Sequence, residues 1–110
     1  MTEESCLFCR IIDREIPAEI VHEDEYIVVF KDINPKAQVH LLVIPRQHVD
    51  GLDDINEEDH AQMMGYMMTK LNKIAEEHKL TNGYKVQINT GKGGGQEVFH
   101  LHLHVTGSEA

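Results

Sequence analysis

The sequence of 110 residues lacks any long apolar run and starts without a basic segment. A transmembrane helix needs about 20 predominantly apolar residues, and no stretch of this chain meets that requirement. The first residues, Met1 to Glu4, are acidic where a signal peptide would be basic. We therefore expect a cytoplasmic protein that has no membrane as a partner.

Basic residues are also scarce, with 10 Lys and Arg against 19 Asp and Glu and a net charge of −9. This charge repels a polyanion over most of the surface and leaves no basic stripe for a phosphodiester backbone. A nucleic acid polymer is therefore not an expected partner. A small anionic ligand is still compatible, because local amides and imidazoles act on a phosphate within a screening length of about 8 Å.

Only two cysteines occur, and we find no repeats, low-complexity segments or linkers. Cys6 and Cys9 form a C-x-x-C pair without the preceding strand of a thioredoxin-type motif, so redox catalysis fits poorly. The pair is either half of a zinc site or two reduced thiols. The length predicts one domain over residues 1–110, large enough for a two-layer core.

The alternation of apolar and turn-forming residues predicts an α+β fold. An apolar cluster before Pro17 indicates a short N-terminal helix. Two strands are predicted at the end of the chain, and the three earlier ones form a meander in an antiparallel sheet of about five strands. The predicted ranges are 6–12 for the short helix and 20–23, 26–31, 39–44, 84–90 and 99–105 for the strands.

One long helix is predicted from Asn56, its N-cap, to about Lys79, with Asn82-Gly83 ending it. Its apolar side chains span an arc of roughly 160°, wider than the ~100° stripe that one sheet face requires. The excess either faces a second subunit or reflects methionines that fill an irregular core. The arc consists of Ala61, Met63, Met64, Met67, Met68, Leu71, Ile74, Ala75 and His78.

The most informative segment is residues 99–105, where three histidines alternate with apolar residues. This period of two predicts a half-buried strand with His100, His102 and His104 on one face and the apolar side chains, including Phe99, in the core. Same-face neighbours lie roughly 6–7 Å apart, so two imidazoles can reach one phosphate or one metal ion. Both a phosphate site and a zinc site agree with this pattern.

A glycine-rich loop, Gly91-Lys92-Gly93-Gly94-Gly95, precedes the histidines. Glycine permits positive φ and close backbone approach, so successive amides can converge on an anion. A merely flexible loop is the alternative, because the loop matches no Walker or dinucleotide fingerprint. In either case the loop delivers Gln96, Glu97 and Val98 to the mouth of the histidine row.

Asn89 and residues 94–104 resemble the signature of the histidine-triad nucleotide hydrolases and transferases. The likeness continues through residues 8–12, 15–17, 30–35 and 40–48, so it covers nearly the whole chain in order, and it is greatest for the branch of the purine nucleoside phosphoramidases. The resemblance implies a histidine-triad fold that dimerises by joining two sheets. It also implies hydrolysis of nucleoside 5′-phosphoramidates or related adenylates, with an AMP-like purine nucleotide as ligand.

The resemblance assigns the catalytic histidines His40, His100, His102 and His104. His102 would attack the α-phosphorus to give a covalent nucleotidyl-histidine, which suits an imidazole that is largely neutral at pH 7. A backbone carbonyl would hold its Nδ1 proton, and His40 would support the site. His104 would hydrogen-bond or protonate a phosphate oxygen and the departing group. Catalysis would then require no cofactor.

Substrate-binding residues follow from the same resemblance. Asp32 would accept hydrogen bonds from the ribose, although a turn-forming role is its plain alternative. Glu97 stands where some members carry serine, so a carboxylate lies close to the expected phosphate. Asn89, Gly95, Gln96, Glu97 and Val98 would contact phosphate and leaving group, and Phe8, Ile11, Phe30 and Ile33 would form the slot for the base. For these four apolar residues a core role is the alternative.

A structural zinc ion held by Cys6, Cys9, His48 and His100 is a further implication of the resemblance, and two inert thiols are the alternative. The other histidines, His22, His60 and His78, are expected on the surface or in helix packing. Three other functions stay open: a nucleotidyl transferase or dinucleotide hydrolase of the same family, a zinc-dependent hydrolase with the triad as ligands, and a non-catalytic nucleotide-binding or scaffold protein.

Overall fold

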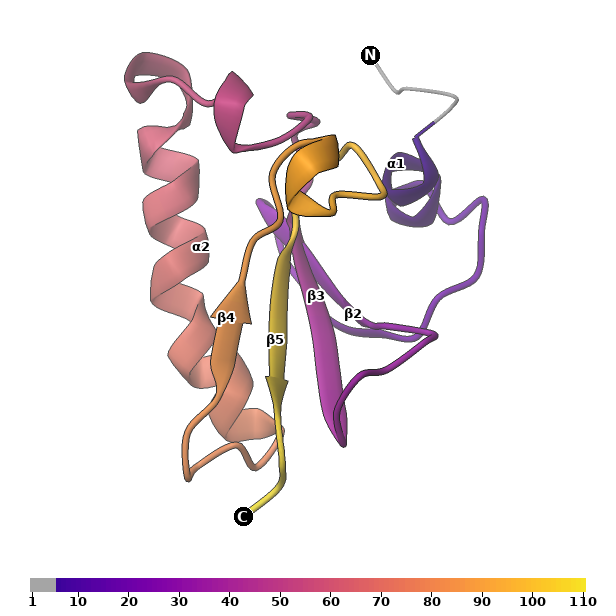
Figure 1. Ribbon diagram of the computed structural model, residues 1–110, viewed down its shortest axis with the longest axis vertical. Helices are drawn as coiled ribbons and strands as arrows, with labels where there is room; N and C mark the ends of the chain where they lie inside the picture. The colour runs from indigo at the N-terminus through magenta and orange to yellow at the C-terminus, as the bar shows by residue number, and fades with distance from the viewer. Residues whose placement is uncertain (1–5) are drawn as a thin grey trace.

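The computed structural model describes residues 6–110, so the acidic segment Met1 to Glu4 lies outside the described residues. Two helices and five strands form an α+β unit, as predicted (Figure 1). In chain order the elements are α1 (Leu7–Ile12), β1 (Ile20–Glu23), β2 (Ile27–Lys31), β3 (Val39–Pro45), α2 (Glu57–Glu77), β4 (Lys85–Gln87) and β5 (Leu103–Gly107), with 3-10 turns at Leu52–Asp54 and Lys92–Gly94.

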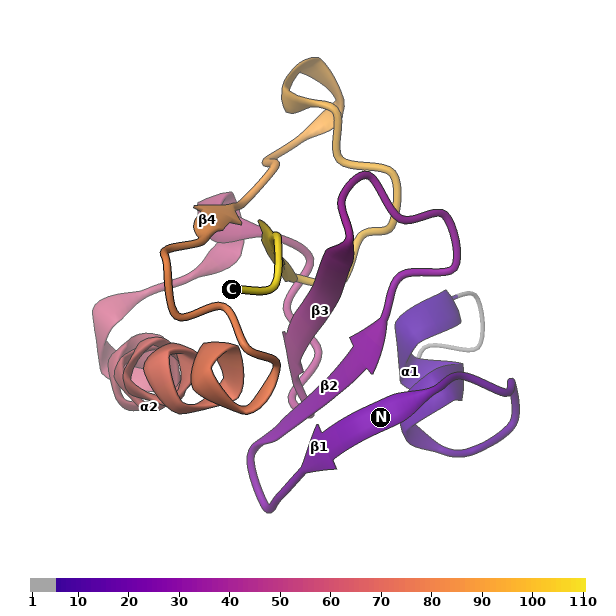
Figure 2. The same ribbon diagram turned by 90° about the horizontal axis from the view of Figure 1, so that it is seen from below.

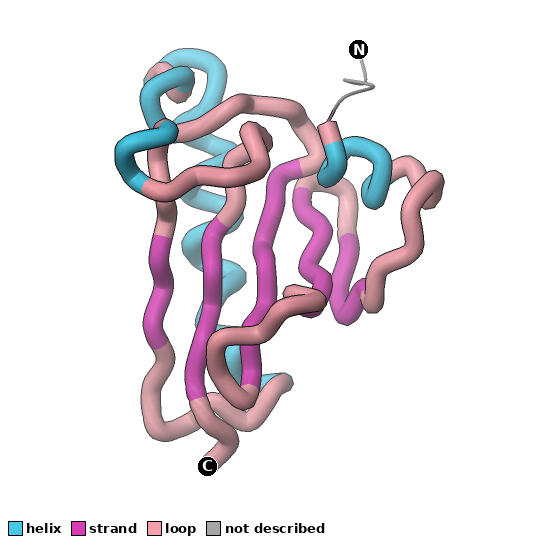
Figure 3. Tube along the Cα trace, turned by 45° about the vertical axis from the view of Figure 1, so that its right-hand side comes forward, coloured by secondary structure: helices cyan, strands magenta, loops and turns pink. Residues whose placement is uncertain are grey.

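The five strands form one antiparallel sheet in the order β1-β2-β3-β5-β4. The first three strands are the predicted meander. The chain then crosses along α2 to the far edge, and β5 returns between β3 and β4 (Figure 3). The last strand of the chain therefore lies inside the sheet, where both of its neighbours hold its backbone.

Helix α2 begins where the sequence predicts, because the Asn56 side chain accepts a hydrogen bond from the backbone N–H of Asp59 at 2.8 Å. It ends at Glu77, earlier than the predicted Lys79. The backbone of Lys79 has φ 65°, a left-handed conformation that closes a helix, so Asn82-Gly83 belongs to the following turn. Among residues 6–110, neither helix combines the length and the apolar character needed to cross a bilayer.

Alternation along the strands separates two cores, one on each face of the sheet. The first packs against α2 and the second against α1, which lie on opposite sides of the sheet in Figure 2. Each buried aliphatic side chain contributes roughly 1.5–3 kcal/mol. The first core includes Ile27, Val29, Leu41, Val43, Leu103 and Val105 with Met67, Leu71 and Ile74, and the second includes Val28, Phe30, Leu42 and Ile44 with Phe8 and Ile11.

The predicted arc of α2 is wider than the face that is buried. Met67, Leu71, Ile74 and Ala75 are buried, whereas Met68 is 50% exposed and Ala61 is also exposed. One sheet face covers only the narrower stripe, as the geometry of a helix on a sheet requires.

Two predicted strands are shorter in the structure. The strand expected over residues 84–90 covers only Lys85–Gln87, because the chain beyond it turns into the glycine-rich loop, where the Asn89 side chain binds the carbonyl of Gly94. The histidine-rich strand begins at Leu103 instead of Phe99. The Leu101 N–H donates to the Val49 carbonyl at 2.7 Å, outside the sheet, and Phe99 is 48% exposed, so its predicted core position was wrong.

Candidate active site

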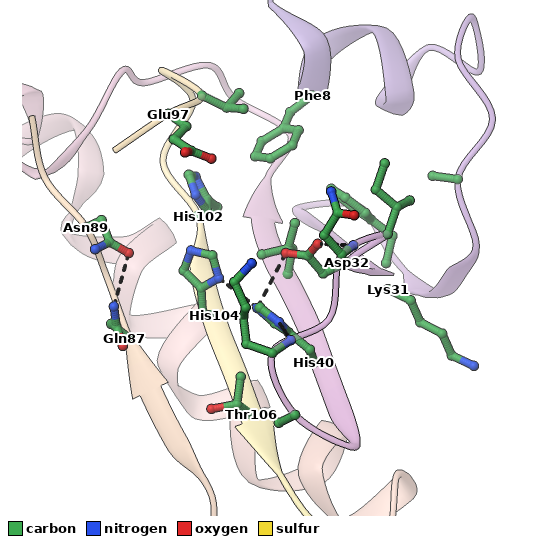
Figure 4. A pocket seen from close by; sticks show the side chains of 18 of the residues that line it. Phe8, Lys31, Asp32, His40, Gln87, Asn89, Glu97, His102, His104 and Thr106 are labelled. Carbon is green, nitrogen blue, oxygen red and sulfur yellow. Dashed lines mark hydrogen bonds and ion pairs between the residues drawn. The ribbon is translucent and has the colours of Figure 1, made fainter. Parts of the chain in front are cut away.

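A cavity of about 710 Å³ opens on the α1 side of the sheet, in the size range of small-molecule sites. We call it the pocket. Side chains from β3, β5, α1 and the turn after β2 point into it, and His102, His104 and His40 form its floor (Figure 4). Of the residues predicted for the site, it is lined by Phe8, Ile11, Phe30, Asp32, Ile33, His40, Asn89, Gly95, Glu97, Val98, His102 and His104.

One ring nitrogen of His102 makes a hydrogen bond within the protein, and the other ring nitrogen is free. Its Nδ1 lies 2.7 Å from the carbonyl oxygen of His100, so Nδ1 carries the proton and donates it. The lone pair is then on Nε2. Burial lowers the pKa of His102, which keeps the ring neutral at pH 7, and the Phe8 ring contacts it edge-on with centroids 5.0 Å apart. His102 therefore presents an uncharged nucleophilic nitrogen.

A chain of hydrogen bonds sets the protons of the other two histidines. The backbone N–H of Lys36 donates to Nδ1 of His40 at 3.0 Å, so the His40 proton is on Nε2. That atom lies 2.9 Å from Nδ1 of His104, which must accept. His104 therefore carries its own proton on Nε2. Burial lowers the pKa of both histidines, so this arrangement of neutral rings persists at pH 7.

Asp32 stands opposite the histidines at the turn after β2. One carboxylate oxygen accepts the backbone N–H of Asn34 at 2.8 Å, and the other lies 3.5 Å from Nε2 of His40. The neighbouring Ile33 is 86% exposed. The Phe8 and Phe30 rings pack edge-on, with centroids 5.3 Å apart, and both line the pocket. An apolar slot thus lies beside a carboxylate with one oxygen free of backbone bonds.

The glycine-rich loop does not form the predicted nest of free amides. The N–H groups of Gly94, Gly95 and Gln96 donate to carbonyls of Gly91 and Lys92 within the loop itself. Positive φ at Gly91 (72°) and Gly95 (84°) makes this closed turn accessible to glycine. Within residues 6–110, no protein acceptor takes the N–H of Glu97 or Val98, and both residues line the pocket, so these amides are available to an anion there.

Gln96 is buried and does not line the pocket, contrary to the substrate-binding role expected of it. Its Oε1 accepts the Gly91 N–H at 2.8 Å, and its Nε2 donates to the carbonyls of Asp50 at 2.6 Å and Val98 at 3.1 Å. With these three partners, the oxygen and the nitrogen of the buried amide both have their hydrogen bonds satisfied. Gln96 therefore joins three segments behind the pocket.

His100 also lies away from the pocket, on the other side of the chain from His102 and His104. Its Nδ1 is 3.3 Å from the sulfur of Cys6 and 3.5 Å from that of Cys9. The physical reason is that the His100 ring is held between the Pro45 carbonyl, 2.8 Å from its Nε2, and the two sulfurs. His100 contacts His102 through its carbonyl oxygen rather than its ring.

Cys6, Cys9, His48 and His100 form a second cluster, the cysteine cluster, whose ligand atoms all lie within 4.8 Å of one another. Both histidines present Nδ1 to the sulfurs, because their Nε2 atoms are held by the Pro45 carbonyl (2.8 Å, His100) and the Asp50 carboxylate (2.7 Å, His48). Metal-bound histidines have this kind of outer partner.

The donor set of the cysteine cluster fits zinc in number, type and tautomer. Burial raises the pKa of the Cys6 thiol to about 11 and lowers that of His100 to about 4. A neutral His100 ring is the form that binds a metal, and the thiol would lose its proton to the ion. The two sulfurs and two nitrogens would hold zinc as a cross-link between α1, the segment after β3 and the segment before β5.

The remaining histidines are outside both clusters, as expected. His22 contacts Asp24, His60 accepts the Asn56 N–H at the start of α2, and His78 caps its end. Lysine side chains that sequence reasoning missed also line the pocket: Lys31, Lys36 and Lys85. Their signal in the sequence was weak, because isolated lysines in turns and edge strands are usually solvated.

Comparison with known proteins agrees with this geometry. A family model described as "Scavenger mRNA decapping enzyme C-term binding" matches residues 5–110. Protein HitA of Neisseria gonorrhoeae is 53% identical over 105 residues, covering 96% of this chain and 97% of that protein. The purine nucleoside phosphoramidase of Escherichia coli (strain K12) is 43% identical over 108 residues, covering 97% of this chain and 89% of that protein.

Solved structures give the same result. A HIT family hydrolase from Clostridium thermocellum superposes with a TM-score of 0.92 at 44% identity, covering 97% of this chain and 93% of that chain. A HIT family hydrolase from Legionella pneumophila gives a TM-score of 0.90 at 41% identity, with 96% and 95% covered. This chain therefore belongs to the histidine-triad (HIT) family and is a hydrolase of that family.

Proposed function

We propose that this protein hydrolyses nucleoside 5′-phosphoramidates or related adenylates through a covalent nucleotidyl-histidine on His102. The observation that carries the proposal is the bond from His102 Nδ1 to the His100 carbonyl, which leaves the Nε2 lone pair for attack. The resemblance to the phosphoramidase of Escherichia coli supports the substrate class. The edge-on packing of the Phe8 ring against His102, with centroids 5.0 Å apart, supports an apolar slot beside the proposed nucleophile.

The nucleotide is bound by groups on opposite sides of the pocket. Phe8, Ile11, Phe30 and Ile33 receive the purine base, and the free oxygen of Asp32 accepts the ribose hydroxyls. The backbone amides of Glu97 and Val98 and the side chain of Asn89 contact the α-phosphate and the leaving group.

Catalysis proceeds in two displacements at the α-phosphorus. The Nε2 lone pair of His102 forms a bond to phosphorus, and the P–N bond breaks, its electron pair leaving with the amine nitrogen, which takes up a proton from solvent. The Nε2–H of His104 donates to a phosphate oxygen as charge develops there. Water then bonds to the same phosphorus, the phosphorus–histidine bond breaks, and a proton passes to solvent as the nucleoside monophosphate is released.

Zinc in the cysteine cluster has a structural role in this scheme. When bound, it would cross-link α1, which carries Phe8, to the segment that carries the His100 carbonyl. His48 and His100 would bind it through Nδ1. Removal of the metal is therefore expected to lower the melting temperature while leaving measurable hydrolysis.

The protein acts as a homodimer in the cytoplasm, where the Cys6 and Cys9 thiols stay reduced. The exposed side chains of Met68 on α2 and of Val86 on the edge strand β4 support a second copy as the partner. Light scattering coupled to size exclusion gives the mass in solution, and a monomer at micromolar concentration contradicts this assignment.

The decisive experiment compares wild type with His102→Ala on an adenosine 5′-phosphoramidate, with and without chelator. We expect AMP release to fall by at least about 10³-fold in the variant, and acid-quenched wild type to carry a labile AMP adduct by mass spectrometry. His78→Ala, outside the pocket, is the matched control. If the chelator abolishes turnover, the protein is a zinc-dependent hydrolase. If the protein binds nucleotide without turnover, it is a binding or scaffold protein. Dinucleotide hydrolysis or transfer in preference to phosphoramidate cleavage selects the other activities of the family.

A further inference from the structure

Positive side chains are concentrated at the pocket, although the chain as a whole is acidic. Three of the 10 Lys and Arg residues line it, Lys31, Lys36 and Lys85, but only two of the 19 Asp and Glu residues do. Lys31 is paired with the carboxylate of Glu19 at 2.9 Å. Within residues 6–110, no carboxylate lies at ion-pair distance from the ammonium group of Lys36 or Lys85. In this part of the chain, two cations at one cavity therefore have no anionic partner.

The register of the sheet places Lys85 beside the histidines. Lys85 of β4 pairs with Thr106 of β5, and Thr106 pairs with His40 of β3. All three line the pocket, and directly paired residues lie about 4.5–5.5 Å apart, so they form one row across this face of the sheet. Gln87 and His104 are paired in the neighbouring row. The long side chain of Lys85 therefore lies at the edge of the space in front of Thr106 and His104.

Lys36 lies at the other end of this row, in the turn before β3. Its backbone N–H donates to Nδ1 of His40 at 3.0 Å, and the residue lines the pocket. Burial lowers the pKa of His40, the Asp32 carboxylate opposes this effect, and the positive charge of Lys36 adds to it. Lys36 thus acts on the pocket from the β3 side and Lys85 from the β4 side, with the hydroxyl of Thr106 between them. We call Lys36, Lys85 and Thr106 the lysine subsite.

The lysine subsite lies away from the groups that the proposed function assigns to the nucleoside. In Figure 4, Phe8 and Glu97 lie at the His102 end of the histidine row. Thr106 lies at the opposite end, beyond His104. The carboxylate of Glu97 is thus separated from the lysine subsite by the two histidines. With the base beside Phe8 and the α-phosphate at the histidines, the lysine subsite is left for the leaving group.

We propose that the lysine subsite binds an anionic group on the leaving amine, so that the preferred substrates are phosphoramidates whose amine carries a carboxylate or a phosphate. This inference rests on the proposed function and specifies its leaving group. The amine departs with the electron pair of the P–N bond and takes up a proton, while its anionic group stays between the two ammonium groups and the hydroxyl. Each exposed lysine contributes modestly, so the preference depends on both.

Matched leaving groups test the lysine subsite. The anionic substrates are the adenosine 5′-phosphoramidates of β-alanine and of 2-aminoethyl phosphate, and the neutral substrate is that of β-alaninamide. For each protein, kcat/KM for an anionic substrate is divided by kcat/KM for the neutral one, so that a general effect of a substitution on turnover cancels. We expect this ratio to fall by about threefold in Lys36→Met and in Lys85→Met, and by about tenfold when both are combined. Added salt should lower the ratio of wild type.

Lys73→Met, at an exposed position of α2 on the other face of the sheet, removes the same charge and should leave the ratio unchanged. Equal ratios for wild type and the double lysine variant overturn the lysine subsite, and so does an equal fall in Lys73→Met. If the neutral phosphoramidate is still hydrolysed, the proposed function stands without the subsite. If none of the three substrates releases AMP, both fail. The anionic substrate with the larger lysine-dependent change identifies the bound group as carboxylate or phosphate.

Discussion

Nε2 of His40 lies 2.9 Å from Nδ1 of His104, and this contact decides which nitrogen of His104 bears a proton. Because Nδ1 of His40 is already an acceptor for the Lys36 N–H, the proton between the two rings belongs to His40. His104 is thereby restricted to the tautomer with its proton on Nε2. In the proposed function this N–H serves the phosphate, so His40 would be a positioning residue that acts through its neighbour.

Two substitutions at His40 separate its two contacts. In His40→Gln the amide nitrogen overlays Nε2 and still donates to His104, whereas the shorter side chain of His40→Asn reaches only the Lys36 N–H. We expect kcat to fall by at least about tenfold in His40→Asn with little change in KM, and to stay within severalfold of wild type in His40→Gln. Nitrogen chemical shifts of the His104 ring report its tautomer. Equal kcat values for the two variants would contradict the role of His40 in setting the tautomer of His104.

Gln96 is predicted to be a stabilising connection between segments. Gln96→Glu keeps the acceptor for Gly91 and removes the donors to Asp50 and Val98, whose carbonyls then face a buried carboxylate. We expect a loss of about 1–3 kcal/mol in the free energy of unfolding, measured by urea titration. Gln47→Glu, at an exposed position, is the control. Equal unfolding midpoints for the two variants would show that these bonds contribute nothing.

Alanine at two glycines should have opposite effects. A Cβ at Gly51 would lie 3.0 Å from Oε1 of Gln96, which its own hydrogen bonds hold in place, so Gly51→Ala should cost about 1–3 kcal/mol. Nothing lies within 4 Å of a Cβ at Gly65, on the exposed side of α2. Gly65→Ala should stabilise the protein by roughly 0.5–1 kcal/mol. Thermal or urea unfolding measures both, and the same sign for both would refute the assignment.

Asp24 should make the protein sensitive to acid. Burial alone would raise the pKa of this carboxyl, but the N–H groups of Tyr26 and Ile27 and the hydroxyl of Tyr66 donate to it and hold its pKa well below the ordinary value. The carboxylate therefore stabilises the folded state fully above the unfolded-state pKa of about 3.9, and this contribution is lost as the pH falls through and below that value.

The test compares Asp24→Asn with wild type by urea unfolding at pH 7 and pH 3.5. At pH 7 the variant should be less stable by about 1–3 kcal/mol, and the difference should narrow at pH 3.5, because wild type has begun to lose the same contribution. Asp53→Asn, which is exposed, should follow wild type at both values. If the difference in the free energy of unfolding between Asp24→Asn and wild type is the same at both pH values, Asp24 is not the titrating group.

The sequence predicted the elements whose residues repeat regularly. The meander, the N-cap Asn56 and the position of His104 in β5 follow from local periodicity and capping chemistry. The side-chain directions of Gln96 and His100 do not, because residues 96–102 have no repeating backbone and are held by distant partners such as Asp50 and Pro45. The directions of these side chains are therefore set by hydrogen bonds to residues distant in the sequence, which local periodicity does not reveal.

Strand β5 places Leu103 and Val105 against α2, and His104 and Thr106 in the pocket, by simple alternation. Loss of one codon inside this strand would exchange the two sets, moving an imidazole into the hydrocarbon layer and a leucine into the cavity. The same loss at the exposed Gly93, outside the sheet, would exchange no side chains between the two faces of a strand. The tolerance of the chain to the deletion of one residue should therefore differ sharply between positions only about ten residues apart.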